Sequence, residues 1–564
     1  MVGKVVRSVA DRVARLDAAV HSPVETRPAA GHLRAAWVAA AACGVFMVSV
    51  ALRQKGPTIH PDEFGFLANG QVLIGHVEAQ VPTGSFYPAG YGLVTGLGAL
   101  VTGSVEGAYR TALSVNVVLA VLVGVAARSL AVRGFGLSRQ MGTLAGLLTF
   151  VAPGTIVSAM FSWPETLARL AFIGLIGLVV AATRSMSTTM TVALGATAGL
   201  LPALHGRFTL MVPVVCLVIV WWGLRRDISR LASAAALGAA VAGYAVSYVL
   251  NTFVKESIYA ASYDQENRLL RRLIDIDTWP ALLRTMTGQS WYLLATSFGL
   301  AGIAIGWALW RARPGGGDVA LRRDPQRLAL VVMVGCTGAL VFTGGLQLLY
   351  GDRGDHLIYG RYVELLVPVL WVAALAAMET SARVVQRLWF VSAGAIAGVA
   401  ALYVIADGGD ALKGRWFTKG NVVFPNIVGT DAARYVVDPG LVTFGVLFAV
   451  VGLVFWLLFA RRGAIAPVAM VLLLAVAGVV SGQRSILSRT KVFDATGSSL
   501  DVALASNPER IGFDMGVRND RAYYFLRYKT HPVLLDRFDV SSEQAVVPDA
   551  YSCIYGWADK PPRG

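Results

Sequence analysis

Residues 108–128 read AYRTALSVNVVLAVLVGVAAR, an almost uninterrupted apolar run that ends on an arginine. A helix needs about 20 mostly apolar residues to cross the hydrocarbon core of a bilayer, and this run has that length. Similar runs recur along the chain of 564 residues, of which 55% are hydrophobic and only 15% are charged. The sequence therefore predicts an all-α, polytopic membrane protein.

The charged residues between the runs predict how the spans are oriented. Basic residues favour the cytoplasmic side, and the arginine-bearing links at 128–139, 225–230, 311–327, 383–387 and 461–462 share that side only if residues 88–103 do not cross. That stretch is short and rich in glycine, each of which costs about 1 kcal/mol of helix propensity. We therefore expect 88–103 to be a juxtamembrane or re-entrant element.

About thirteen spans result, with a cytoplasmic N-terminus and an extracytoplasmic C-terminus in a cell membrane. They lie near 35–52, 108–128, 141–159, 166–183, 189–204, 208–224, 231–253, 291–310, 328–349, 361–378, 388–405, 441–460 and 464–481.

Three parts follow from this topology: a basic cytoplasmic tail at 1–34, a transmembrane domain at 35–481, and an extracytoplasmic module at 482–564. We expect strands at 510–515 and 532–538 of the module and a helix at 521–530, which would form a small α/β cap. The other long outward segments are 53–107, 254–290 and 406–440. Binding and catalytic residues often lie on such segments above a rigid scaffold, which favours an activity at the outer membrane face.

Charge and cysteine content exclude other classes of function. The formal net charge of +15 lies largely in short links between apolar runs, so it indicates orientation and no nucleic-acid partner. Three of the four cysteines lie inside apolar runs and Cys553 stands alone near the end, so their spacing predicts neither a disulfide nor a zinc site. The sequence requires no cofactor and leaves a divalent cation open.

Asp62 and Glu63 are adjacent acids just after the first predicted span. Two carboxylates beside a low-dielectric boundary disfavour each other's ionisation, so this arrangement is unfavourable unless it serves a function. One could act as a general base toward a hydroxyl, and the other could orient a substrate, tune its neighbour or help to hold a cation. A solvated loop turn is the alternative.

Several outward residues could bind an anion or a sugar beside these acids. Arginine suits forked recognition of phosphate, and Arg and Tyr also anchor helices at the membrane interface, which is the alternative. Glu165 opens the fourth predicted span, where it could bind a sugar, pair with Arg169 one turn on, or suit the helix dipole. The anion-binding candidates, with Arg361 first, are Arg361, Arg207, His356, His205 and Arg353, and the substrate-binding candidates are Tyr87, Tyr362 and Glu165.

The acid pair, followed by Tyr87-Pro88-Ala89-Gly90-Tyr91, resembles the GT-C class of membrane glycosyltransferases. It is similar to the families that use polyprenyl-phosphate sugars: protein mannosyltransferases, lipid A aminoarabinose transferases and actinobacterial arabinofuranosyltransferases. Ala89 stands where those families commonly have a second proline, and the stretch from Ala108 to Asn116 is similar to the opening of their second span. The resemblance implies a GT-C-like fold and an inverting displacement, with Asp62 as the base and Glu63 as its support.

The resemblance also implies the partners, namely the bilayer, a polyprenyl-phosphate-linked sugar and a glycan, lipid or protein acceptor of the cell envelope. Mannose, arabinofuranose and aminoarabinose remain alternatives for the sugar. A transporter of an envelope precursor or solute is the main rival, although the polar residues lie mostly on one side. A membrane scaffold would not explain the paired acids.

Overall fold

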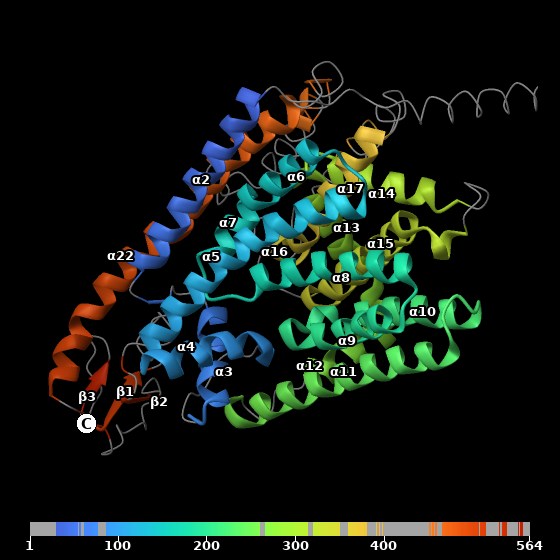
Figure 1. Cartoon of the computed structure of the whole chain (residues 1–564). Coiled ribbons are helices and arrows are strands. Elements are labelled where there is room, and N and C mark those ends of the chain that lie inside the picture. Colours follow the sequence, from blue (N-terminus) through green and yellow to red (C-terminus); the bar gives the residue numbers. More distant parts are fainter. Residues whose placement is uncertain are drawn as a thin grey trace, which may run out of the picture.

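The computed structural model describes residues 30–54, 61–76, 86–259, 265–313, 320–349, 359–380 and 465–506, a few isolated positions, and short segments at 508–514, 533–538 and 553–555. The described chain is mostly helical (Figure 1). Its helices are α2 (Ala30–Arg53), α3 (Pro61–Leu73), η1 (Ala89–Tyr91), α4 (Gly92–Thr102), α5 (Val105–Ser129), η2 (Leu130–Gly134), α6 (Arg139–Val151), α7 (Pro153–Ala159), α8 (Glu165–Ser185), α9 (Thr188–Leu204), η3 (Gly206–Leu210), α10 (Met211–Leu224), α11 (Arg230–Ile258), α12 (Gln265–Ile274), η4 (Ile276–Thr278), α13 (Trp279–Thr296), α14 (Leu300–Arg311), η5 (Leu321–Arg323), α15 (Pro325–Leu348), α16 (Gly360–Val363), η7 (Glu364–Leu366), α17 (Val367–Thr380) and α22 (Ile465–Ala505).

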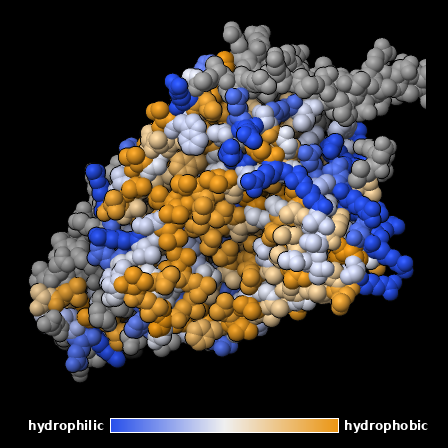
Figure 2. All heavy atoms as spheres, viewed as in Figure 1, coloured by the Kyte–Doolittle hydropathy of each residue, from blue (hydrophilic) through white to orange (hydrophobic). Residues whose placement is uncertain are grey.

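Length and composition make this an integral membrane protein. Within the described residues, 8 helices are long and apolar enough to cross a membrane, or up to 10 if two bent pairs each count as one span. Figure 2 shows a broad apolar patch across the middle of one face, with hydrophilic side chains toward its margins. An exposed apolar surface of this extent marks contact with lipid.

Most of the predicted spans lie on these helices. Of the thirteen, 388–405 and 441–460 fall almost wholly outside the described residues, so the number thirteen stays a prediction. The predicted span 291–310 is wrong as a single helix, because α13 and α14 meet at an angle of 106°. Phe298 and Gly299 at this break have φ of 55° and 78°, a left-handed conformation that ends a helix.

The stretch 88–103 forms η1 and α4, an apolar helix of 14 residues that is shorter than a span. The segment 53–107, which the sequence places outside the membrane, is more regular than the sequence suggested, because α3 lies within it as well. The two short helices approach closely at glycines: a Cβ on Gly96 would lie 2.9 Å from the carbonyl oxygen of Gly70. Asp62 and Glu63 therefore lie in the first turn of a packed helix, where acids suit the helix dipole.

Helix α22 runs past the predicted start of the C-terminal module. It continues without a break from Ile465 to Ala505 and lies alongside α2 (Figure 1), so the predicted boundary at residue 482 falls inside a helix and stays a prediction. Beyond it, strands β1 (Arg510–Asp514), β2 (Leu534–Phe538) and β3 (Cys553–Tyr555) form a parallel sheet in the order β2-β1-β3. The first two strands were predicted and β3 was not. The predicted helix at 521–530 lies almost wholly outside the described residues.

Candidate active site

Asp62 is the second residue of α3, and each of its two carboxylate oxygens contacts a donor side chain. Tyr87 Oη donates to Asp62 Oδ1 at 2.8 Å, and Arg361 Nη2 pairs with Oδ2. The Asp62 side chain keeps 14% of its surface exposed. A carboxylate that is oriented by two donors and still accessible has the properties that a general base requires.

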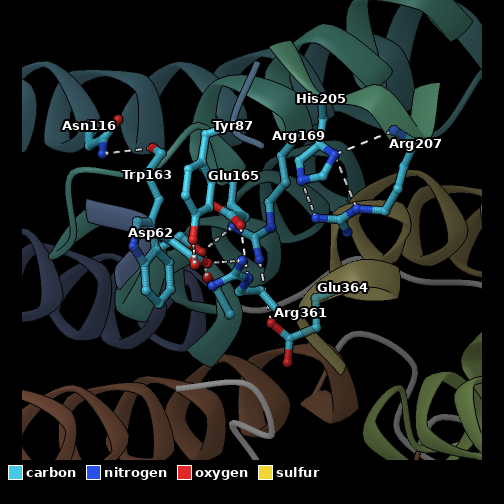
Figure 3. A network of polar contacts seen from close by, with 12 residues as sticks. Asp62, Tyr87, Asn116, Trp163, Glu165, Arg169, His205, Arg207, Arg361 and Glu364 are labelled. Carbon is cyan, nitrogen blue, oxygen red and sulfur yellow. Dashed lines mark hydrogen bonds and ion pairs between the residues drawn. The ribbon is translucent and has the colours of Figure 1, made fainter. Parts of the chain in front are cut away.

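Arg361, the second residue of α16, lies between two carboxylates. Its Nε is 3.0 Å from Glu165 Oε1, while Nη2 contacts Asp62 (Figure 3). The guanidinium carbon also lies 4.5 Å from the centre of the Trp163 ring, and Trp163 stacks on Phe161. Of the alternatives for Glu165, the ion pair with Arg169 does not form: Glu165 pairs with Arg361 of another element, and Arg169 pairs with Glu364.

A second buried ion pair lies one turn further along the same elements. Arg169 Nη2 is 3.5 Å from Glu364 Oε2, and these side chains are only 1% and 6% exposed. Ser158 Oγ accepts from Arg169 Nη1 at 2.7 Å, and Tyr292 Oη donates to Glu364. Sequence reasoning missed this pair, although charged residues within the predicted spans 166–183 and 361–378 were the signal that could have found it.

Glu63 uses its carboxylate differently from Asp62, although the two are adjacent. It is fully buried, and its Oε1 accepts from the backbone N–H of Ser162 at 2.9 Å and from Ser162 Oγ at 3.3 Å. Asn116 donates to the carbonyl oxygens of Phe161 and Trp163 at 2.7 and 3.2 Å. Together Glu63 and Asn116 fix the segment that places Trp163 against Arg361.

The backbone around Tyr87 is fixed in a similar way. Asn69 Nδ2 donates to the carbonyl oxygen of Tyr87 at 2.7 Å, and Tyr259 Oη donates to Asn69 Oδ1 at 3.0 Å. Asn251 Oδ1 accepts from the N–H of Ala89 at 2.8 Å. Helices α3 and α11 thereby hold the turn before η1, so that the Tyr87 hydroxyl reaches Asp62.

Arg207, in η3, is a buried cation whose described partners are all uncharged. It is 1% exposed, its guanidinium carbon lies 3.3 Å from the centre of the Tyr362 ring, and its Nε donates to His205 Nδ1 at 3.1 Å. Among the described residues no carboxylate lies within ion-pair distance of Arg207, and its Nη1 has no hydrogen-bond partner. Buried charges are normally paired, so Arg207 is suited to bind an anion.

His205, directly after α9, stays an uncharged partner of that cation. Burial and, secondly, the positive charge of Arg207 hold the pKa of His205 well below its usual range. Because Arg207 Nε donates to Nδ1, the imidazole acts as an acceptor toward the guanidinium. Arg207 is therefore a buried positive charge whose direct contacts, His205 and Tyr362, are uncharged.

The structure brings most of the predicted site residues together. Figure 3 shows Asp62, Tyr87, Glu165 and Arg361 converging, with His205 and Arg207 to one side. Arg353 and His356 lie outside the described residues. In the described part of the chain, no three His, Cys, Asp or Glu residues are grouped to hold a metal ion, so the divalent cation gains no protein site there.

The converging residues lie at the ends of helices. Glu165 is the first residue of α8, His205 follows α9, Asp62 is second in α3 and Arg361 is second in α16. These helix ends bring side chains from distant parts of the chain into one polar cluster (Figure 3).

Comparison with known proteins gives a limited result. No protein-family model and no curated protein matches the chain. It is similar to a crystal structure of ArnT from Cupriavidus metallidurans in the apo state, with a TM-score of 0.49 and 17% identity over 88% of this chain and 85% of that one. The same protein bound to undecaprenyl phosphate gives a TM-score of 0.49 and 16% identity over the same shares. A likeness at this level assigns no function. The functional argument therefore rests on the side chains of this protein.

Proposed function

We propose that this protein transfers a sugar from a polyprenyl-phosphate donor to an acceptor hydroxyl at the outer membrane face, with Asp62 as the general base. One observation carries the proposal: an oriented, accessible carboxylate lies in the same polar cluster as a buried arginine that has no carboxylate partner. The first group can take a proton and the second can receive a phosphate.

In the proposed step, Asp62 takes the proton of the acceptor hydroxyl. The acceptor oxygen forms a bond to the anomeric carbon while the bond from that carbon to the phosphate oxygen breaks. The electron pair of the broken bond stays with the polyprenyl phosphate, which changes from a monoanionic diester to a dianionic monoester. A single displacement of this kind inverts the anomeric configuration.

The extra negative charge on the leaving phosphate requires a cation in place before the reaction, because preorganised charges stabilise a transition state best. The sequence favoured Arg361 for this role, but Arg361 is already paired with Asp62 and Glu165. Arg207 is the better candidate, since no carboxylate of the described residues lies within ion-pair distance of it and its Nη1 has no hydrogen-bond partner. Arg361 then orients the base, and Arg207 binds the phosphate.

The place of Arg207 in the chain suits a lipid-linked ligand. It lies near the start of a candidate membrane span that runs from Gly206 to Leu224. A phosphate bound there would leave its polyprenyl chain beside an apolar helix, within reach of the bilayer.

The test is conversion of polyprenyl-phosphate mannose, arabinofuranose and aminoarabinose to polyprenyl phosphate by the purified protein, with an envelope extract as the acceptor source. Asp62→Asn should lower the rate by about 10²–10⁴-fold, the usual contribution of a positioned base. Glu106→Gln is the matched control, because Glu106 forms only an exposed i,i+4 pair with Arg110 and should keep full activity.

Unchanged turnover in Asp62→Asn would refute the base. If the wild-type protein consumes no donor but carries a solute across proteoliposomes, the transporter alternative is correct.

A further inference from the structure

Gln289 is a buried polar side chain that has no role in the reaction as proposed above. It lies in α13 and is 0% exposed. Among the described residues, neither its Oε1 nor its Nε2 has a hydrogen-bond partner. An amide that is buried without partners destabilises the fold, and native proteins rarely keep one without a reason.

Gln289 lies beside the group proposed to bind the anion. A Cβ on Gly344 of α15 would be 2.8 Å from Gln289 Oε1 and 3.1 Å from Tyr362 Cδ2, so the amide and the Tyr362 ring both pack against this glycine and lie near each other. The guanidinium of Arg207 in turn stacks on Tyr362, with its carbon 3.3 Å from the centre of the Tyr362 ring. The absence of a side chain at Gly344 leaves room for the amide.

Two unpartnered groups therefore flank Tyr362: Nη1 of Arg207 and the amide of Gln289. Arg207 can only donate, which suits an oxygen of an anion. The amide can donate from Nε2 and accept at Oε1, which suits a hydroxyl group that does both. A phosphate with a polyhydroxylated group attached to it presents this combination.

We propose that Gln289 is a substrate-binding residue that hydrogen-bonds a hydroxyl of the donor sugar, while Arg207 binds the adjoining phosphate. This assignment rests on the proposed function and extends it to recognition of the sugar. α13 also carries Tyr292, which donates to Glu364, so the helix that presents the amide is tied to the ionic network around Arg361.

The experiment compares wild type with Gln289→Leu, and with Gln289→Met as a second variant, in detergent. Thermal unfolding of the ligand-free protein gives the structural effect. Affinity is measured separately for polyprenyl phosphate and for whichever of the three polyprenyl-phosphate sugars the wild-type protein converts. Because the amide is unpartnered, both variants should unfold at a higher temperature than wild type. Their affinity for the lipid-linked sugar should fall by about tenfold, the order of one lost hydrogen bond, with no change for polyprenyl phosphate.

Gln326→Leu is the matched control, because Gln326 Nε2 donates to the carbonyl oxygen of Phe135 at 2.8 Å. This variant should unfold at a lower temperature and bind the sugar donor as wild type does.

Three outcomes would overturn the assignment: lower thermal stability of both Gln289 variants, unchanged affinity for the lipid-linked sugar, or an equal loss for polyprenyl phosphate, which would place the amide on the phosphate. Failure of the wild-type protein to bind any of the donors would refute the proposed function itself.

Discussion

Glu165 and Arg361 form a buried ion pair, with 3.0 Å between Oε1 and Nε. One turn further along both elements, Arg169 and Glu364 pair at 3.5 Å with the signs exchanged. α8 thus carries an acid followed by a base, and α16 with η7 carries a base followed by an acid. A shift of one turn would bring like charges together, so the two pairs fix the register in which Arg361 meets Asp62.

We expect the deeper pair to behave as a unit. Arg169→Met or Glu364→Leu alone leaves one charge buried without its partner, a loss of about 3–5 kcal/mol in comparable pairs. The double variant replaces both charges with apolar side chains and should recover most of that stability. Thermal unfolding in detergent measures all three, and single variants as stable as wild type would contradict the pairing. Glu106→Gln, in an exposed pair, should change little.

The sequence predicted the class of the fold because span length and positive charge are local properties that the chain displays directly. Span 108–128 lies within α5, and the glycine-rich stretch 88–103 forms a helix of 14 residues, shorter than a span. The break between α13 and α14 was missed, because two left-handed residues interrupt a run that stays apolar throughout. The length of α22 was missed for the opposite reason, since its helix continues after the apolar residues end.

At the site, the sequence identified the residue types but not their pairings. Asp62 and Arg361 both stood out, yet their contact joins segments far apart in the chain. Adjacency suggested that Glu63 works beside Asp62, whereas the fold directs Glu63 to the backbone of Ser162. Arg207 ranked below Arg361 because the difference between them, the presence of carboxylate partners, exists only in three dimensions.

The contact of Tyr87 with Asp62 should depend on a missing side chain at Gly65. A Cβ at Gly65 would lie 2.7 Å from Cγ of Tyr87, so Gly65→Ala should displace the ring and its hydroxyl from Asp62. We expect donor conversion to fall at least tenfold, the order of one hydrogen bond that orients the base. Gly238→Ala meets nothing within 4 Å and should keep full activity, with a gain in stability of about 1 kcal/mol from helix propensity. Equal activity of the two variants would show that the Tyr87 contact is dispensable.

The depressed pKa of His205 predicts how stability depends on pH. Burial and the Arg207 charge lower the pKa in the folded protein, whereas in the unfolded chain it stays near its usual value of about 6.5. Below that pH the unfolded state binds more protons, so stability should be constant above about pH 6.5 and fall as the pH is lowered. His205→Gln keeps an acceptor for Arg207 and should reduce the difference in unfolding temperature between about pH 5 and pH 7. A difference of the same size in both proteins would assign the acid sensitivity to other groups.

The topology can be tested at the two ends of the chain. A reporter joined after Gly482 would interrupt α22, which runs from Ile465 to Ala505. A reporter joined to Gly564 avoids this and should be accessible from outside the cell, because the sequence predicts an odd number of spans after a cytoplasmic N-terminus. A reporter on Met1 should be inaccessible from outside. Finding both ends on the same side would refute the odd number of spans.

The division of labour between the two arginines can be tested by the same substitution at each. A lysine ammonium is a compact point charge and lacks the fork with which Arg361 reaches both Asp62 and Glu165. Arg361→Lys should therefore leave the base poorly oriented and lower kcat by about tenfold or more, with little change in KM for the donor. Arg207→Lys should chiefly raise KM, because it weakens a contact made to the phosphate before and during the reaction. Steady-state kinetics with the converted donor separate the two effects. If Arg361→Lys instead raises KM while kcat is unchanged, Arg361 binds the donor phosphate, as the sequence first favoured, and the role of Arg207 must be reassigned.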